Sequence, residues 1–150
     1  MKAKSILFPT DFSENSEIAL LHASSLARDS GAKILIVHVH DPSMKIADTG
    51  FAGYPLAENE DTQRELQTML ETVTPPYPAV PYSHRLVHGI PAEEIVRLAK
   101  MENTDIIVMG SHGRRGVSRL LMGSVAEAVV RRAPCPVLTV KQPAEELSGA

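Results

Sequence analysis

The residues best suited to binding an anion lie between Asp105 and Glu127. A short apolar run, Asp105-Ile-Ile-Val-Met-Gly110, leads into Ser-His-Gly113, and Gly123-Ser124 follows after nine intervening residues. Glycine lets a ligand approach the backbone closely, and a helix N-terminus stabilises a nearby anion by about 0.3–1 kcal/mol. The pattern predicts a phosphate-binding loop, which we name the glycine loop (residues 110–124). Three arginines inside it add positive charge: Arg114, Arg115 and Arg119.

Each part of the glycine loop also has a purely structural interpretation. Ser124-x-x-Glu127 matches a capping box, in which the serine caps the start of a helix. Glycines that follow a strand are ordinary turn residues. Any one of these features leaves both interpretations open, whereas their combination favours an anion site.

Apolar runs typical of buried strands alternate with helical patterns along the chain. This alternation predicts an α/β fold with a parallel sheet and right-handed crossovers. We expect one domain, residues 1–150, with a polar tail at 142–150, and we place the third, more polar strand near a sheet edge. The expected strands are 5–9, 33–39, 80–87, 104–109 and 136–140, and the expected helices are one capped by Ser13 and Gly31 and three at 58–72, 91–102 and 124–132.

Polar residues and glycines follow several of the expected strands. Asp11 comes directly after the first strand, His40 and Asp41 follow the second, and Gly110 ends the fourth. Ligands of open parallel sheets bind beyond the carboxyl ends of the strands, where strand order reverses. If the first and fourth strands are neighbours, Asp11 and the glycine loop meet at one crevice. The Asp11 carboxylate could then accept hydrogen bonds from a ribose or a base, although aspartate is equally favoured as a cap of the turn and first helix.

Composition and cysteine usage exclude several classes of protein. A formal net charge of −3 argues against a general nucleic-acid binder. No run reaches the roughly 20 apolar residues that span a bilayer, and no signal-peptide core follows the N-terminus, so we expect a cytoplasmic protein without a membrane partner. Cys135 is the only cysteine, which rules out an intrachain disulfide, and its flanking prolines suggest a buried small hydrophobe, not a reactive thiol.

The chain lacks the best-known nucleotide and metal motifs. It contains no Gly-x-x-x-x-Gly-Lys-Ser/Thr stretch, and its first strand does not lead into Gly-x-Gly-x-x-Gly. Four of the six histidines lie in two pairs, His38 with His40 and His84 with His88, and a zinc site needs three or four convergent ligands. We therefore expect no metal site built by protein ligands alone and identify no catalytic residue.

The sequence resembles the universal stress protein family over essentially its whole length, except residues 41–60 and the tail. The nucleotide-binding branch of that family carries Gly-x2-Gly-x9-Gly-Ser/Thr, which this chain matches in full. The matching segments are Ile6-Leu7-Phe8-Pro9-Thr10-Asp11-Phe12-Ser13, Val37-His38-Val39, Val87-His88-Gly89-Ile90-Pro91, Gly110, Gly113, Gly123, Ser124, and Ala133-Pro134-Cys135-Pro136-Val137.

The resemblance implies a fold and a set of binding residues. The fold is a single open five-stranded parallel sheet in the order 3-2-1-4-5 with helices on both faces, of the adenine nucleotide alpha hydrolase-like type. The ligand is ATP, ADP or AMP, with Mg²⁺ accompanying ATP. Asp11 would contact the adenosine beside Pro9 and Thr10, and the Val39 backbone would recognise adenine. Met109 and Gly110 would line the ribose and phosphate side. The residues around the phosphates would be Gly113, Arg114, Gly123, Ser124 and Val125.

The resemblance also implies a biological role. It indicates a stress-response or signalling module that binds adenine nucleotide and acts on an unknown protein partner as a homodimer through residues 137–140. Pairing of this apolar edge strand with its copy would protect it from solvent. Two alternatives stay open: a slow ATPase or phosphotransferase that uses the same site, and a structural dimer that binds no nucleotide.

Overall fold

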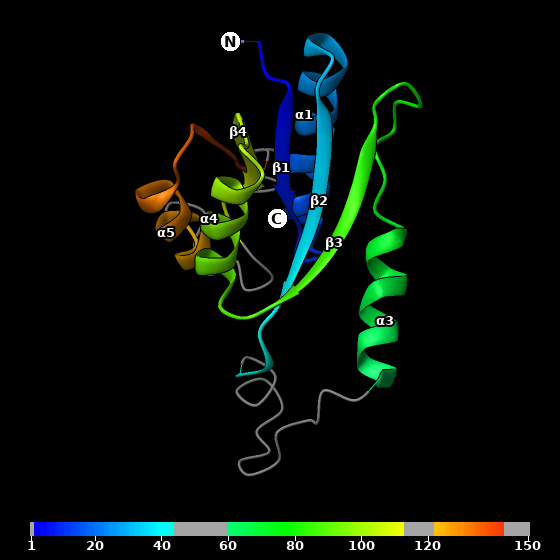
Figure 1. Ribbon diagram of the computed structural model, residues 1–150, viewed down its shortest axis with the longest axis vertical. Coiled ribbons are helices and arrows are strands. Elements are labelled where there is room, and N and C mark those ends of the chain that lie inside the picture. The colour runs from blue at the N-terminus through cyan, green and yellow to red at the C-terminus, as the bar shows by residue number, and fades with distance from the viewer. Residues whose placement is uncertain (1, 44–59, 113–121, 143–150) are drawn as a thin grey trace, which may run out of the picture.

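The computed structural model describes residues 2–43, 60–112 and 122–142, and Figure 1 shows their arrangement. Five strands form one sheet in the order β3-β2-β1-β4-β5, and every neighbouring pair is parallel. The α/β class and the strand order expected from the sequence are confirmed. The elements are β1 (Ser5–Pro9), α1 (Glu14–Ser30), β2 (Lys33–His40), α3 (Glu60–Glu71), β3 (Tyr82–His88), α4 (Pro91–Met101), β4 (Ile106–Gly110), α5 (Ser124–Arg132) and β5 (Val137–Val140).

The central strands are buried on both faces, because their side chains alternate between two helical layers. Ile6 and Phe8 of β1 pack in a core with α1 and α3, whereas Leu7 belongs to the core beneath α4 and α5. Figure 1 shows α4 and α5 together beside β4, and α3 near β3 at the other edge of the sheet. Three alanines give α1 a small-residue face against the sheet: Ala19, Ala23 and Ala27.

Local capping residues set the ends of α1 as expected. The Ser13 side chain accepts a hydrogen bond from the Ser16 backbone N–H (3.2 Å). At the other end Gly31 adopts φ 77°, a left-handed conformation that glycine tolerates, and its N–H donates to the Ala27 carbonyl. The helix therefore starts almost directly after β1, which confines the connecting turn to the carboxyl end of that strand.

Two strands begin two residues later than expected, because local turns use the backbone groups, and the other strand boundaries lie within one residue of the expected ones. Val80 lies in a turn, where its N–H donates to the Tyr77 carbonyl, and β3 begins only at Tyr82. Thr104 donates to the Ala99 carbonyl at the end of α4, so β4 begins at Ile106. The placement of β3 at a sheet edge is confirmed. Within the described residues, no helix combines the length and apolar character needed to cross a membrane.

Candidate functional site

The ends of three neighbouring strands bring most of the predicted site together. β1 lies between β2 and β4, so the turn that contains Asp11 follows a strand adjacent to the one that ends at Gly110. Pro9 is paired with Val37, and β2 continues beyond this point to His40. The end of β2, including Val39, therefore projects past the end of β1 and forms one side of the crevice expected at a reversal of strand order.

The turn after β1 is held by its own polar groups. Thr10 is buried; its hydroxyl lies 3.0 Å from the Ser16 hydroxyl and accepts a hydrogen bond from the Phe12 N–H. An oxygen of the half-buried Asp11 carboxylate accepts from the Ser13 N–H at 2.9 Å. Of the structural role considered for Asp11, the cap of the turn is thus present, whereas Ser13 caps the helix. The turn contact fixes the position of the carboxylate at the strand end.

Phe12 gives this turn an unusual backbone conformation. Its φ of 64° lies in the left-handed region, which costs a non-glycine residue about 1–3 kcal/mol and occurs most often at functional sites. The Phe12 ring packs against the His38 ring with centroids 4.4 Å apart, and His38 Nδ1 hydrogen-bonds the Thr10 carbonyl at 2.8 Å. The second strand therefore holds the turn in place through His38.

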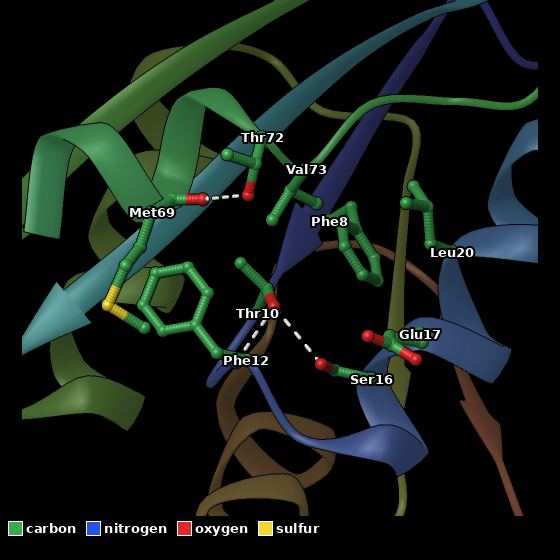
Figure 2. A pocket seen from close by; sticks show the side chains of 9 residues that line it. All are labelled: Phe8, Thr10, Phe12, Ser16, Glu17, Leu20, Met69, Thr72 and Val73. Carbon is green, nitrogen blue, oxygen red and sulfur yellow. Dashed lines mark hydrogen bonds between the residues drawn. The ribbon is translucent and has the colours of Figure 1, made fainter.

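A cavity of about 210 Å³ lies on the α1–α3 side of the sheet. Figure 2 shows the Phe12 ring beside Met69, and the Thr10 and Ser16 hydroxyls joined by a hydrogen bond at the cavity wall. Val39 and Met109, in contrast, are buried in the core on the opposite face. Among the described residues, Thr10 is the one that lines this cavity and is also predicted to bind nucleotide. Its lining comprises Phe8, Thr10, Phe12, Ser16, Glu17, Leu20, Met69, Thr72 and Val73.

The two ends of the glycine loop are joined to each other and to β5. The Gly123 N–H donates to the Ser111 carbonyl at 2.7 Å, and the Ser111 N–H donates to the Val140 carbonyl at 2.9 Å. The start of α5 is thereby placed beside the end of β4. Gly113, Arg114, Arg115 and Arg119 lie outside the described residues.

The N-terminus of α5 contradicts the capping-box interpretation of Ser124. Gly123 is the N-cap residue, no side chain caps the helix, and Ser124 is the first helical residue with its side chain exposed. The chain enters the helix through Gly123, because the hydrogen bond to Ser111 fixes that residue at the boundary. Val125, the next predicted contact, is half-buried. An uncapped helix N-terminus beside the strand ends offers unpaired N–H groups to an anion.

His112 supplies a further polar group beside this helix end. Its Nδ1 lies 3.0 Å from the Ser111 hydroxyl, whereas its Nε2 is buried and has no hydrogen-bond partner. Ser24 Oγ is the one other such side-chain atom among the residues that the structure describes. A buried unsatisfied group costs about 1–3 kcal/mol, and a polar ligand that bonds it removes this cost. The backbone N–H groups at the start of α5 and the unpaired His112 Nε2 fit a phosphate-bearing ligand.

Asn15 is the residue that the sequence interpretation missed. It is buried near the start of α1, where Oδ1 accepts from the His112 N–H at 2.9 Å and Nδ2 donates to the Val140 carbonyl at 3.2 Å. Its position one helical turn before Ala19 and two before Ala23 puts a polar side chain on the apolar face of α1. A polar residue at an apolar position of the helix is the sequence signal that could have identified Asn15.

The histidines of the neighbouring strands form no metal site with other residues. His40 and His88 are paired across β2 and β3 with their rings edge to face, 5.7 Å apart. Across residues 2–43, 60–112 and 122–142, no group of three or more histidine, cysteine, aspartate or glutamate side chains could hold a metal ion.

The Cys135 thiol is expected to react slowly with iodoacetamide at neutral pH. Cys135 is half-buried, and burial raises the pKa of its thiol, with the Asp105 charge acting in the same direction. Because the thiolate is the reactive species, a raised pKa lowers the rate of alkylation. Mass-spectrometric labelling of the folded protein should be several-fold slower than labelling in denaturant, and equal rates would contradict this prediction.

The comparison with known proteins agrees with the observed fold and with the family resemblance of the sequence. A family model described as the Universal stress protein family matches residues 2–141. Two universal stress proteins of Methanocaldococcus jannaschii are similar in sequence. One is 37% identical, covering 93% of this chain and 95% of that protein, and the other is 34% identical, covering 95% and 85%.

Solved structures give the same result. The structure of the first of these relatives matches with a TM-score of 0.66 at 35% identity, covering 95% of this chain and 99% of that one. A universal stress protein in complex with cAMP matches with a TM-score of 0.63 at 26% identity, covering 95% of this chain and all of that one. On these matches of sequence and structure, this chain belongs to the universal stress protein family.

Proposed function

We propose that this chain binds an adenine nucleotide, ATP, ADP or AMP, at the carboxyl ends of β1 and β4. The observation that carries the proposal is the pairing of Gly123 with Ser111, which places the uncapped start of α5 directly beside the end of β4. The unpaired buried Nε2 of His112 lies in the same segment. The family member in complex with cAMP supports an adenine nucleotide as the ligand.

The proposed roles follow the order of the nucleotide from base to phosphate. The Val39 backbone recognises the adenine edge, Asp11 accepts from the ribose with Pro9 and Thr10 shaping the turn, and Met109 and Gly110 lie at the ribose and phosphate side. The helix dipole and N–H groups of α5 stabilise the phosphate charge. Mg²⁺ would accompany ATP, and the residues proposed around the phosphates are Gly113, Arg114, Gly123, Ser124 and Val125.

Calorimetry on protein stripped of nucleotide tests this function. Titration with ATP, ADP, AMP and adenosine should give saturable binding, and mass spectrometry of freshly purified, denatured protein should detect adenine nucleotide. Absence of binding at millimolar concentration would overturn the proposal. Release of phosphate from ATP above the buffer blank would instead indicate the slow ATPase.

We further propose that the chain acts in the cytoplasm as a homodimeric stress-response module that transmits the nucleotide state to a protein partner. β5 lies at a sheet edge, and Leu138 on it is 41% exposed. Nearby in the chain, Met122 and Val130 are also exposed apolar side chains. An apolar edge strand is a template for pairing, and pairing with its own copy across a two-fold axis would cover it.

A Leu138→Lys variant is expected to shift the dimer toward monomer, because it introduces a charge on the proposed interface strand. Light scattering after size-exclusion chromatography over a concentration series measures the change. Leu21→Lys is the matched control, since Leu21 is 54% exposed and lies on α1, not on the proposed interface strand. A dimer of unchanged stability in Leu138→Lys would refute this interface.

A further inference from the structure

We propose that Asn15 is a positioning residue for phosphate binding: it holds the start of the glycine loop against the end of β5 without touching the nucleotide. The proposal rests on the nucleotide function proposed above. Asn15 is 4% exposed, and both polar atoms of its amide are engaged far along the chain, Oδ1 by the His112 N–H and Nδ2 by the Val140 carbonyl.

The Asn15 hydrogen bonds close a network across three elements. The Val140 carbonyl accepts from both Asn15 Nδ2 and the Ser111 N–H, using both of its lone pairs. Ser111 in turn accepts from the Gly123 N–H at the start of α5. One side chain of α1 therefore connects the end of β5 to the segment that places the phosphate-binding helix end.

Gly110 shows how closely Asn15 approaches the loop. A Cβ at Gly110 would lie 2.6 Å from Asn15 Oδ1, a distance that real Cβ atoms essentially never show, and 3.0 Å from Asn15 Cγ. Among described glycines only Gly31 and Gly89 have positive φ, so Gly110 is required for space and not for a left-handed backbone. The first glycine of the family motif thus leaves room for the Asn15 amide in this chain.

The same network decides which backbone donors remain for a ligand. The N–H groups of Ser111 and His112 are both engaged within the protein. Neither N–H is therefore available to the phosphates, whereas the uncapped start of α5 is. Only a side chain that donates and accepts at once can make both Asn15 contacts, because alanine offers neither group and a carboxylate offers no donor.

Asn15→Ala is expected to weaken ATP binding on the order of tenfold, because the His112 N–H loses its buried acceptor and the loop start is released. Adenosine affinity should change less than about twofold, since Asp11 and the Val39 backbone, the groups proposed to hydrogen-bond the adenosine, are not the groups that bond the Asn15 amide, and adenosine carries no phosphate. The ratio of the ATP and adenosine dissociation constants, measured by calorimetry on the full chain, is the readout that general destabilisation of a folded protein would not move. Hydrogen exchange of the His112 amide should accelerate in parallel.

Ser24→Ala is the matched control, because Ser24 is also a buried polar residue of α1 but its hydroxyl has no partner. It should leave the ratio of the ATP and adenosine dissociation constants and the exchange of the His112 amide unchanged.

Asn15→Asp is the second variant should Asn15→Ala not fold. It keeps an acceptor for the His112 N–H and loses the donor to the Val140 carbonyl, so protection of the His112 amide should persist while ATP binding weakens. An ATP to adenosine ratio equal to wild type in both variants would overturn the positioning role alone, whereas a wild-type protein that binds no adenine nucleotide would overturn the proposed function as well.

Discussion

A Gly110→Val variant is expected to lose adenine-nucleotide binding and to unfold more readily than the wild type. A Cβ at this position meets Asn15 Oδ1 at 2.6 Å and also the Asn15 backbone oxygen at 3.3 Å, so side-chain rotation of Asn15 relieves only part of the overlap. Overpacking of this kind costs about 1–3 kcal/mol in free energy of unfolding. The displaced segment is the one that holds Gly123, so the helix end proposed to bind phosphate moves with it.

Chemical denaturation and nucleotide calorimetry together measure this prediction. Gly31→Ala serves as the matched control: nothing lies within 4 Å of its added Cβ, but its φ of 77° strains an alanine by about 1–2 kcal/mol. Gly31 lies at the C-terminus of α1, at the opposite end of the sheet from the carboxyl ends of the strands. This variant should therefore lose comparable stability and keep the wild-type affinity for nucleotide. Wild-type nucleotide affinity in Gly110→Val would show that the close approach of Asn15 does not matter for binding.

An Asp11→Ala variant is expected to weaken binding of ATP and adenosine alike, by about 10- to 100-fold, because a hydrogen bond to a charged group contributes about 1.5–3 kcal/mol. The loss should reach adenosine as well as ATP, since Asp11 is proposed to contact the ribose and not the phosphates. This pattern is the opposite of the one expected for Asn15→Ala. Calorimetry with both ligands separates the two roles.

Asp11 also stabilises its own turn, and its control must account for that. The carboxylate accepts from the Ser13 N–H, so Asp11→Ala should lower stability by about 1 kcal/mol. Asp11→Asn keeps an acceptor for Ser13 and removes the charge, so it should retain most of the stability while binding remains weaker than in the wild type. If Asp11→Asn binds adenosine as tightly as the wild type, the negative charge has no part in recognition.

Much of the architecture could be predicted because its causes are local in the sequence. Ser13 and Gly31 cap α1 through contacts within four residues of each position, and short apolar runs mark the strands buried between two layers. Even the edge position of β3 follows from its polar side chains. The boundaries at Val80 and Thr104 were misplaced, because apolar character at a strand start does not reveal a turn that takes up the backbone donor.

The site was predictable only in part, because its groups depend on contacts between distant segments. Ser124-x-x-Glu127 satisfies the pattern of a capping box, but the Gly123 hydrogen bond to Ser111 moves the cap one residue earlier. His112 carries an unpaired buried nitrogen that no spacing rule indicates. Residue types and their spacing identified the glycine loop, but they did not reveal the hydrogen-bond partner of each polar atom.

The order and type of the elements could be predicted from the chain, since propensity, capping and periodicity act over a few neighbouring residues, and the family could be predicted from its motifs. That Gly110 makes room for Asn15, and that Asn15 links His112 to Val140, is visible only in the folded chain. These contacts join residues about a hundred positions apart or more, and they exist only after the sheet has brought α1, β4 and β5 together. A hydrogen bond needs a donor and an acceptor within about 3 Å of each other, and only folding determines which groups meet.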